Sequence, residues 1–119
     1  MYGEILTADR LDSLMHRLCE KLQTLYADKL KSVILYGSYA RGDCKEYSDV
    51  DVMALVDVRG EDKDVYWSNL TDINSDLGWE FDTMLSTLSV DVGRYERFKE
   101  DLPLYKNISE HGRVYYDNR

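Results

Sequence analysis

The sequence predicts an α+β domain, a small β-sheet with helices packed on it. Short runs rich in β-branched residues alternate along the chain with longer segments whose apolar residues recur at helical spacing. This alternation is typical of helices layered on a sheet. The chain has 119 residues, 44% of them hydrophobic and 32% charged, which suits a single domain over residues 1–119.

The first expected helix spans residues 7–30, where leucines fall on one helical stripe and Thr7 or Asp9 caps the start. Two apolar, β-rich runs follow, SVILY at 32–36 and DVDVMALV at 49–56, and both predict strands. The remaining expected elements are a helix over 62–77, a third strand over 79–85 (WEFDTML), a helix over 95–110 interrupted near Pro103, and a short strand over 113–116 (RVYY).

The charge balance and the cysteines narrow the class of protein. The formal net charge is -8, from 23 acidic and 15 basic residues, so the surface repels phosphate backbones and nucleic acid is not expected as the main partner. Cys19 and Cys44 are far apart and form no disulfide framework, which predicts a reduced, cytoplasmic chain. Neither a signal peptide nor a segment long enough to span a membrane is visible, so no membrane partner is expected.

The first predicted strand ends in Gly37-Ser38, a combination suited to holding an anion. Gly37 lets the backbone turn and approach a ligand closely. Ser38 offers a hydroxyl and an N–H at the start of a short expected helix, where donors are unpaired. Arg41 or Lys45 would add a cation. The alternative is an ordinary strand-to-helix turn in which Ser38 is the N-cap.

The second predicted strand carries two carboxylates on one face. Alternation places Asp49 and Asp51 on the same side and the valines on the opposite, core side. Two neighbouring like charges repel and are costly to bury unpaired. A divalent cation between them resolves this, and Mg²⁺ is usually held by one or two carboxylates together with substrate phosphates. The alternative is that both carboxylates lie solvated at an exposed strand start.

The third predicted strand offers two further acids, Glu80 and Asp82. Asp82 is the better candidate to join the pair of aspartates, because apolar residues flank it. Glu80 is then a solvated strand residue. Three acids beside a phosphate-binding turn fit two-metal nucleotidyl transfer, in which the third acid is a metal ligand or the general base on the acceptor hydroxyl.

Taken together, GSYARG at 37–42 and SDVDV at 48–52 resemble the G-S-x-A-R-G…S-D-x-D-[LV] motif of the DNA polymerase β-like nucleotidyltransferase superfamily. In size and layout the chain is similar to its minimal nucleotidyltransferase (MNT) branch. The resemblance is strongest over residues 33–56 and extends over most of the chain as a topology. It implies the polymerase β-like nucleotidyltransferase fold, with a small mixed sheet and helices packed on it.

The resemblance also implies a site. In it Gly37 and Ser38 hold the triphosphate of ATP, the substrate, and Asp49 and Asp51 bind Mg²⁺, with two ions expected. Asp82 is implied as the third catalytic and metal-binding carboxylate by its place in the next strand.

Arg41 and Ser48, from the same motif, join the nucleotide-binding residues. For Arg41 the alternative is pairing with Asp43 or Glu46. Tyr39 and Tyr47 bracket this region and are candidates to stack on the nucleotide base, with loop packing as the alternative.

The MNT branch is similar to the antitoxin half of two-gene systems whose other half is a HEPN-family RNase toxin, and some members transfer AMP from ATP to a tyrosine of the toxin. The resemblance therefore implies Mg²⁺-dependent transfer of AMP to a hydroxyl of a partner protein, with a HEPN toxin as the expected partner. Two alternatives stay open. One is a non-catalytic antitoxin that neutralises its partner by direct contact, and the other is a nucleotidyltransferase for small, aminoglycoside-like acceptors.

Overall fold

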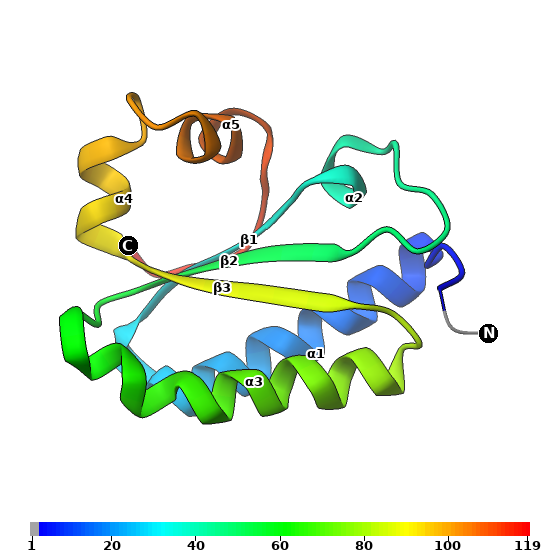
Figure 1. Cartoon of the computed structure of the whole chain (residues 1–119), viewed down its shortest axis with the longest axis horizontal. Coiled ribbons are helices and arrows are strands. Elements are labelled where there is room, and N and C mark those ends of the chain that lie inside the picture. The colour runs from blue at the N-terminus through cyan, green and yellow to red at the C-terminus, as the bar shows by residue number, and fades with distance from the viewer. Residues whose placement is uncertain (1–2) are drawn as a thin grey trace.

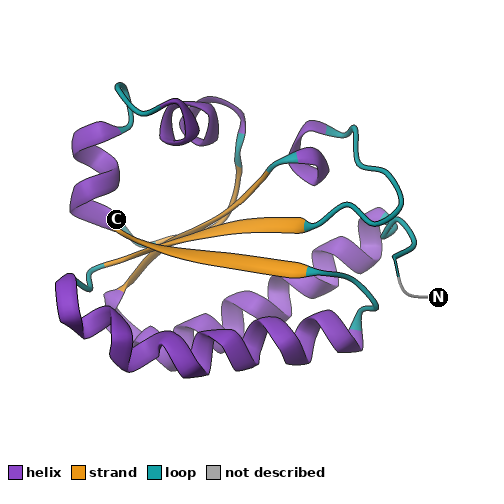
Figure 2. Cartoon of the chain, viewed as in Figure 1, coloured by secondary structure: helices purple, strands orange, loops and turns teal. Residues whose placement is uncertain are grey.

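The computed structural model describes residues 3–119, except for the side chain of Glu61. A twisted four-stranded sheet lies between two layers of helices (Figures 1 and 2). Helices α1 (Ala8–Tyr26) and α3 (Lys63–Glu80) cover one face, and α4 (Val92–Phe98) and α5 (Pro103–His111) cover the other. The α+β class predicted from the alternation of periodicities is confirmed.

The sheet is mixed, with the strand order β3-β2-β1-β4. β1 (Leu30–Tyr36) pairs antiparallel with β2 (Val50–Val56) and with β4 (Arg113–Asp117). β2 pairs parallel with β3 (Leu85–Asp91). Parallel neighbours need a crossover connection, and α3 supplies it.

The described part of the chain also contains three short helical segments. Two of them are 3₁₀ turns that connect a helix with a strand. The 3₁₀ turn η1 (Ala27–Lys29) leads from α1 into β1, and η2 (Gly60–Asp62) leads into α3. The four-residue helix α2 (Ser38–Arg41) follows β1 at the end of the sheet, where β2 and β3 begin. A loop over residues 42–49 then returns to β2.

Helix α1 forms as the leucine stripe predicts. The Thr7 hydroxyl caps it by accepting a hydrogen bond from the Arg10 N–H. The helix ends before residue 30, the predicted boundary, because Ala27 adopts a positive φ of 51°. The buried stripe consists of Leu11, Leu14, Met15, Leu18, Cys19, Leu22 and Tyr26.

The core has two parts, one on each face of the sheet. The larger part lies between the sheet and helices α1 and α3, and it takes the valine side of β2, including Val50 and Val52. The smaller part lies under α4 and α5, where Met53 and Leu55 of β2 pack with Ile108. This confirms the predicted division of β2 into two faces.

The predicted third strand over 79–85 is wrong. Trp79 and Glu80 complete α3 instead, and residues 81–84 form the turn that leads into β3. The helix continues this far because Leu77 and Gly78 are buried, and Glu80 forms an ion pair with Arg17 of α1. The real strand, LSTLSVD, alternates buried and exposed residues, a pattern that its serines and threonine make less conspicuous than a run of valines.

The expected helix over 95–110 is in fact two helices. Pro103 begins α5, as a proline in the first turn of a helix is expected to do. Helix α4 begins before residue 95 because the Asp91 carboxylate accepts hydrogen bonds from the backbone N–H groups of Gly93 and Arg94. The short final strand is confirmed as β4, and it pairs with β1.

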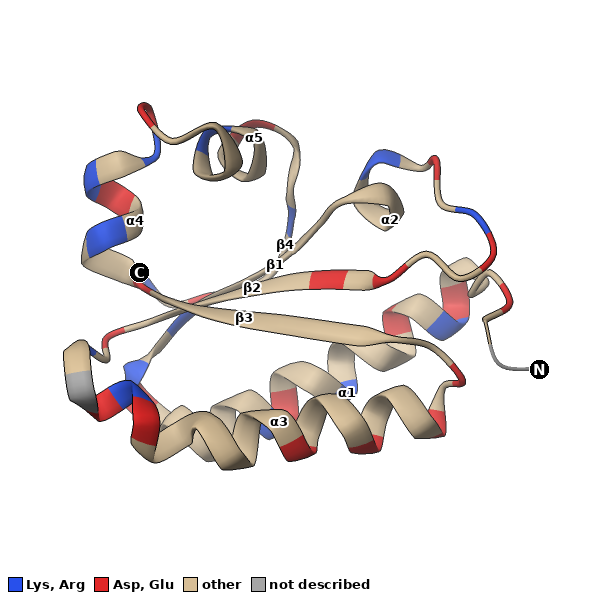
Figure 3. Ribbon diagram, in the orientation of Figure 1, with Lys and Arg blue, Asp and Glu red and all other residues tan. Residues whose placement is uncertain are grey.

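Acidic residues are distributed along α1 and α3, in the loop before β2 and in the turn before β3 (Figure 3). Among residues 3–119, no helix combines the length and the apolar character needed to cross a bilayer.

The two free cysteines should differ in reactivity. Burial in the α1 stripe raises the pKa of the Cys19 thiol to about 11, whereas Cys44 lies partly exposed in the loop over 42–49. Since the thiolate is the reactive form and a free thiol has a pKa of about 8.5, iodoacetamide at pH 8 should label only Cys44 in the folded protein. Mass spectrometry of digested protein locates the label.

The Cys44→Ser variant is the control for this labelling. It should take up no iodoacetamide until denaturant is added, and then one equivalent. Equal labelling rates for both thiols in the native wild type would contradict the buried position of Cys19.

Candidate active site

The candidate site lies where β1 ends and β2 begins, beneath α2 (Figure 1). Gly37 follows the last residue of β1 and has a φ of 76°, a backbone conformation that residues with a Cβ rarely adopt. Its carbonyl then accepts hydrogen bonds from the N–H groups of Ala40 and Arg41. The turn predicted from the Gly-Ser pair is therefore present and leads directly into α2.

This turn lies against one of the two aspartates. The pairing of β1 with β2 sets Tyr36 opposite Asp51. A Cβ added to Gly37 would lie 2.6 Å from the Asp51 Oδ2 atom. The structure therefore brings together the two halves of the motif, the Gly-Ser turn and a carboxylate, which are separated by more than a dozen residues of sequence.

The two carboxylates form a like-charged pair at this end of the sheet. Asp51 is partly buried within β2, and Asp49 is exposed just before the strand. Burial raises the pKa of Asp51, the neighbouring Asp49 charge raises it further, and the Arg41 guanidinium opposes both effects. Burial, followed by the Asp51 charge, also raises the pKa of the Tyr36 phenol. Such an arrangement favours a bound cation.

Asp82 does not gather with Asp49 and Asp51. Its predicted metal-binding role depended on a place in the third strand, and residue 82 is not in that strand. It lies exposed in the turn between α3 and β3, with a φ of 54°. Its carbonyl accepts a hydrogen bond from the Gly3 N–H (3.1 Å), and it borders a depression with Arg10 and Phe81. Among the described residues, no three His, Cys, Asp or Glu side chains gather to hold a metal ion.

The residue of β3 that stands beside Asp51 is Ser86. Its position did not follow from the sequence pattern, because the predicted strand over 79–85 ended one residue earlier. The alternation in LSTLSVD, followed by the Asp91 cap, is the signal that would have placed the strand correctly.

Arg41 and Ser48 are both held within the site region. The Arg41 Nε lies 3.4 Å from the Asp43 Oδ2 in an exposed ion pair, which is the alternative pairing considered from the sequence. Arg41 also acts electrostatically on Asp51. The Ser48 hydroxyl accepts a hydrogen bond from the Lys45 N–H (2.9 Å) and so shapes the loop that returns to β2.

Of the two tyrosines, Tyr39 is a packing residue. It is only 4% exposed, and its hydroxyl accepts a hydrogen bond from the Leu6 N–H (3.1 Å). Tyr47 is 71% exposed, with a φ of 64°, and its N–H donates to the Gly3 carbonyl (2.7 Å). Of the two, Tyr47 has the exposed side chain, and part of its ring lies against Gly3.

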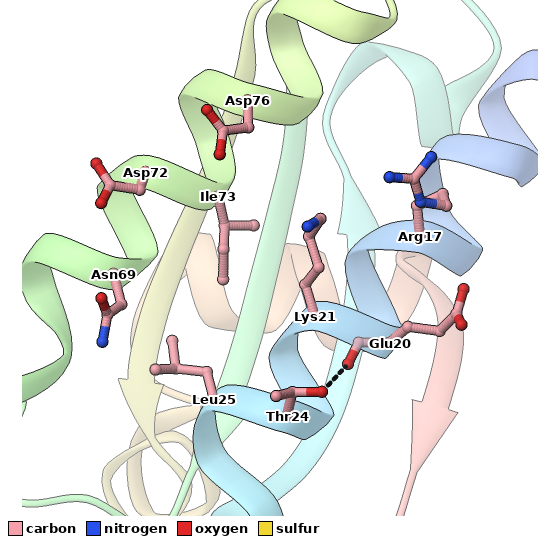
Figure 4. A pocket seen from close by; sticks show the side chains of 9 residues that line it. All are labelled: Arg17, Glu20, Lys21, Thr24, Leu25, Asn69, Asp72, Ile73 and Asp76. Atoms are coloured by element: carbon pink, nitrogen blue, oxygen red, sulfur yellow. Dashed lines mark hydrogen bonds between the residues drawn. The ribbon is translucent and has the colours of Figure 1, made fainter.

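Two depressions in the surface differ in their relation to the site. One, of about 160 Å³, lies between α2 and α5 and is bordered by Gly37 and Arg41, with Asn107 and His111 on its α5 side. The other, of about 680 Å³, lies between α1 and α3. In Figure 4, Lys21 of α1 faces α3 across this second groove. Because α1 and α3 cover the face of the sheet opposite Asp51, the larger groove is separate from the carboxylate pair.

Comparison with known proteins relates the chain to nucleotidyltransferases. A family model described as "Nucleotidyltransferase domain" matches residues 15–116. A Methanocaldococcus jannaschii protein named "Putative protein adenylyltransferase MJ0604" is 30% identical over 97 residues, which cover 80% of this chain and 87% of that protein. A second protein of the same organism and the same descriptive name is 63% identical over 35 residues, 29% of this chain and 35% of the relative.

Solved structures share the fold at low sequence identity. One is a tri-AMPylated Shewanella oneidensis HEPN toxin in complex with MNT antitoxin, matched with a TM-score of 0.55 and 14% identity over 90% of this chain and 72% of that chain. Another is a toxin-antitoxin with AMP-PNP, matched with a TM-score of 0.53 and 19% identity over 84% of this chain and 73% of that chain. These matches confirm the predicted nucleotidyltransferase fold.

The Gly37 contact can be tested with two alanine variants. Gly37→Ala and Gly42→Ala both force a positive φ on alanine, which costs roughly 1 kcal/mol. A Cβ at Gly42 would meet nothing within 4 Å, whereas one at Gly37 would clash with Asp51. Gly37→Ala should therefore lower the free energy of unfolding by about 1 kcal/mol more than Gly42→Ala, the cost of turning the Asp51 carboxylate out of its preferred rotamer, measured by urea denaturation.

A double-mutant cycle isolates the clash. In an Asp51→Ala background, Gly37→Ala should cost about as much as Gly42→Ala, because the clashing oxygen is gone. An unchanged cost of Gly37→Ala in that background would show that the penalty does not come from Asp51.

Proposed function

The chain belongs to the nucleotidyltransferase domain family, and we propose that it transfers AMP from ATP to a hydroxyl group of a partner protein. One observation carries this proposal: the Gly37 backbone lies so close to Asp51 that a Cβ there would be 2.6 Å from Oδ2. Transfer at phosphorus needs a phosphate-binding turn and a cation-binding carboxylate side by side. This contact provides that arrangement.

The residues present fit Mg²⁺. Asp49 and Asp51 supply two carboxylates. Burial and then the neighbouring Asp49 charge raise the pKa of Asp51, and a bound divalent cation would offset both effects. Mg²⁺ is typically bound through one or two carboxylates, with phosphate oxygens and water completing its ligands. When bound, it would stabilise the negative charge that develops at phosphorus.

The chain's own residues would have different roles in binding ATP. Gly37 lets the Asp51 carboxylate approach the turn, and Ser38 would offer its hydroxyl and N–H to a phosphate at the start of α2. Arg41 adds a positive charge on the same side as Asp51. The acceptor hydroxyl loses its proton to solvent water as its oxygen attacks the α-phosphorus. The bond between the α-phosphorus and the bridging oxygen breaks, pyrophosphate leaves, and AMP is joined to the acceptor oxygen.

A protein acceptor is favoured by the relatives. Several carry a name that describes protein adenylyltransferases, and the fold matches a complex of an AMPylated HEPN toxin with an MNT antitoxin. We therefore propose that the partner is a HEPN-family toxin, and that this chain is its cytoplasmic antitoxin.

A non-catalytic antitoxin is the second candidate function. It is favoured by the lack, among the described residues, of a third carboxylate that gathers with Asp49 and Asp51. In that case the fold would neutralise the toxin by contact alone. The two functions differ in whether the carboxylates are needed.

Incubation with ATP, Mg²⁺ and the partner protein should add one or more AMP units to the partner, detected by intact mass. Asp49→Asn and Asp51→Asn should each reduce the rate at least about a hundredfold, equivalent to about 3 kcal/mol of transition-state stabilisation. Asp82→Asn should retain the wild-type rate, because Asp82 lies outside the site.

Neutralisation assays separate the two candidates. If the Asp49→Asn, Asp51→Asn double variant still neutralises the toxin fully and the wild type adds no AMP, the non-catalytic function is correct. Loss of activity in Asp82→Asn would contradict the site described here.

A further inference from the structure

The strand pairings show which side chains can reach the ion held by Asp51. β2 is a central strand, so Asp51 has one neighbour on each side: Tyr36 on β1 and Ser86 on β3. Residues paired across adjacent strands lie about 5 Å apart and project on the same face of the sheet. A ligand from a neighbouring strand would therefore have to come from position 36 or position 86, and neither residue is a carboxylate.

The rest of β3 offers no substitute on that face. The ladder extends back to Met84, whose carbonyl accepts a hydrogen bond from the Val50 N–H (2.9 Å), and forward to Leu88 and Val90. The acid at the far end, Asp91, pairs with Val56 and caps α4.

The acid before the strand, Asp82, lies exposed in the turn over 81–84. It borders the depression formed with Arg10 and Phe81 rather than the site. In the described part of the chain, the carboxylates at the site are therefore Asp49 and Asp51.

We propose that this chain holds a single divalent ion with its nucleotide, and that Ser86 occupies the place from which a third ligand would secure a second ion. The inference rests on the proposed function, because it concerns the same site. Two carboxylates together with phosphate oxygens and water complete the shell of one Mg²⁺. A second ion about 3.5–4 Å away would need a ligand of its own, and Ser86 provides only a neutral hydroxyl there.

Manganese provides a readout that is independent of catalysis. Mn²⁺ is added with a non-hydrolysable ATP analogue, and bound ions are counted by equilibrium dialysis and examined by electron paramagnetic resonance. Two ions within about 4 Å of each other give a spin-coupled spectrum. The wild type should bind one Mn²⁺ per chain and give the uncoupled spectrum of an isolated ion.

Ser86→Asp should create the second site. Ser86 is exposed on an edge strand, so the substitution is compatible with the fold. The variant should bind two Mn²⁺ per chain with a spin-coupled spectrum. Without metal its melting temperature should fall below that of the wild type, because three carboxylates then repel one another, and Mn²⁺ should restore it.

Leu88→Asp is the matched control. It adds the same charge to the same face of β3, but beside Met53 rather than Asp51, and Leu88 is itself exposed. This variant should bind one ion and give no spin coupling.

The outcomes are distinct. A spin-coupled pair of ions in the wild type overturns the inference and leaves the proposed function intact. A single ion in both the wild type and Ser86→Asp overturns the role given to position 86. No protein-bound Mn²⁺ in the wild type, with the analogue present, overturns both the single-ion site and the proposed function.

Discussion

The contact between Gly37 and Asp51 is the constraint on which the candidate active site depends. Antiparallel pairing of β1 with β2 sets Tyr36 opposite Asp51, and the chain leaves β1 at the next residue with a φ of 76°. Because Gly37 has no Cβ, the carboxylate can approach the backbone of the turn. The turn and the carboxylate therefore act as one unit, although the loop over 42–49 separates them in sequence.

The electrostatics of the site follow from the position of β2 in the middle of the sheet. One face of the strand is entirely core, and the other begins with Asp51 and continues into Met53 and Leu55 under α4 and α5. This places a carboxylate at the boundary between apolar core and solvent. Partial burial and the nearby Asp49 both raise the pKa of Asp51, so a cation bound at this position would stabilise the ionised carboxylate.

Two residues that the sequence suggested for the site, Tyr39 and Asp82, instead connect the loops around the site. The Tyr39 hydroxyl binds the Leu6 N–H, which joins α2 to the segment before α1. Gly3 joins that segment to two other loops, through the Tyr47 N–H and the Asp82 carbonyl. Asp82 therefore contributes through its backbone, and the segment around Gly3 and Leu6 links α2 and the loop over 42–49 to the turn before β3.

The sequence by itself determined the fold class, the first helix, β1 and β2, and the face of β2 that carries Asp51, because local periodicity indicates them directly. It misplaced β3, because an amphipathic stretch of seven residues such as WEFDTML is compatible with either a helix end or a strand. The choice was made by tertiary contacts, in which the Arg17–Glu80 ion pair and the burial of Leu77 extend α3. Which residue stands beside Asp51 depends on the register of two strands far apart in sequence, and only the tertiary structure decides that.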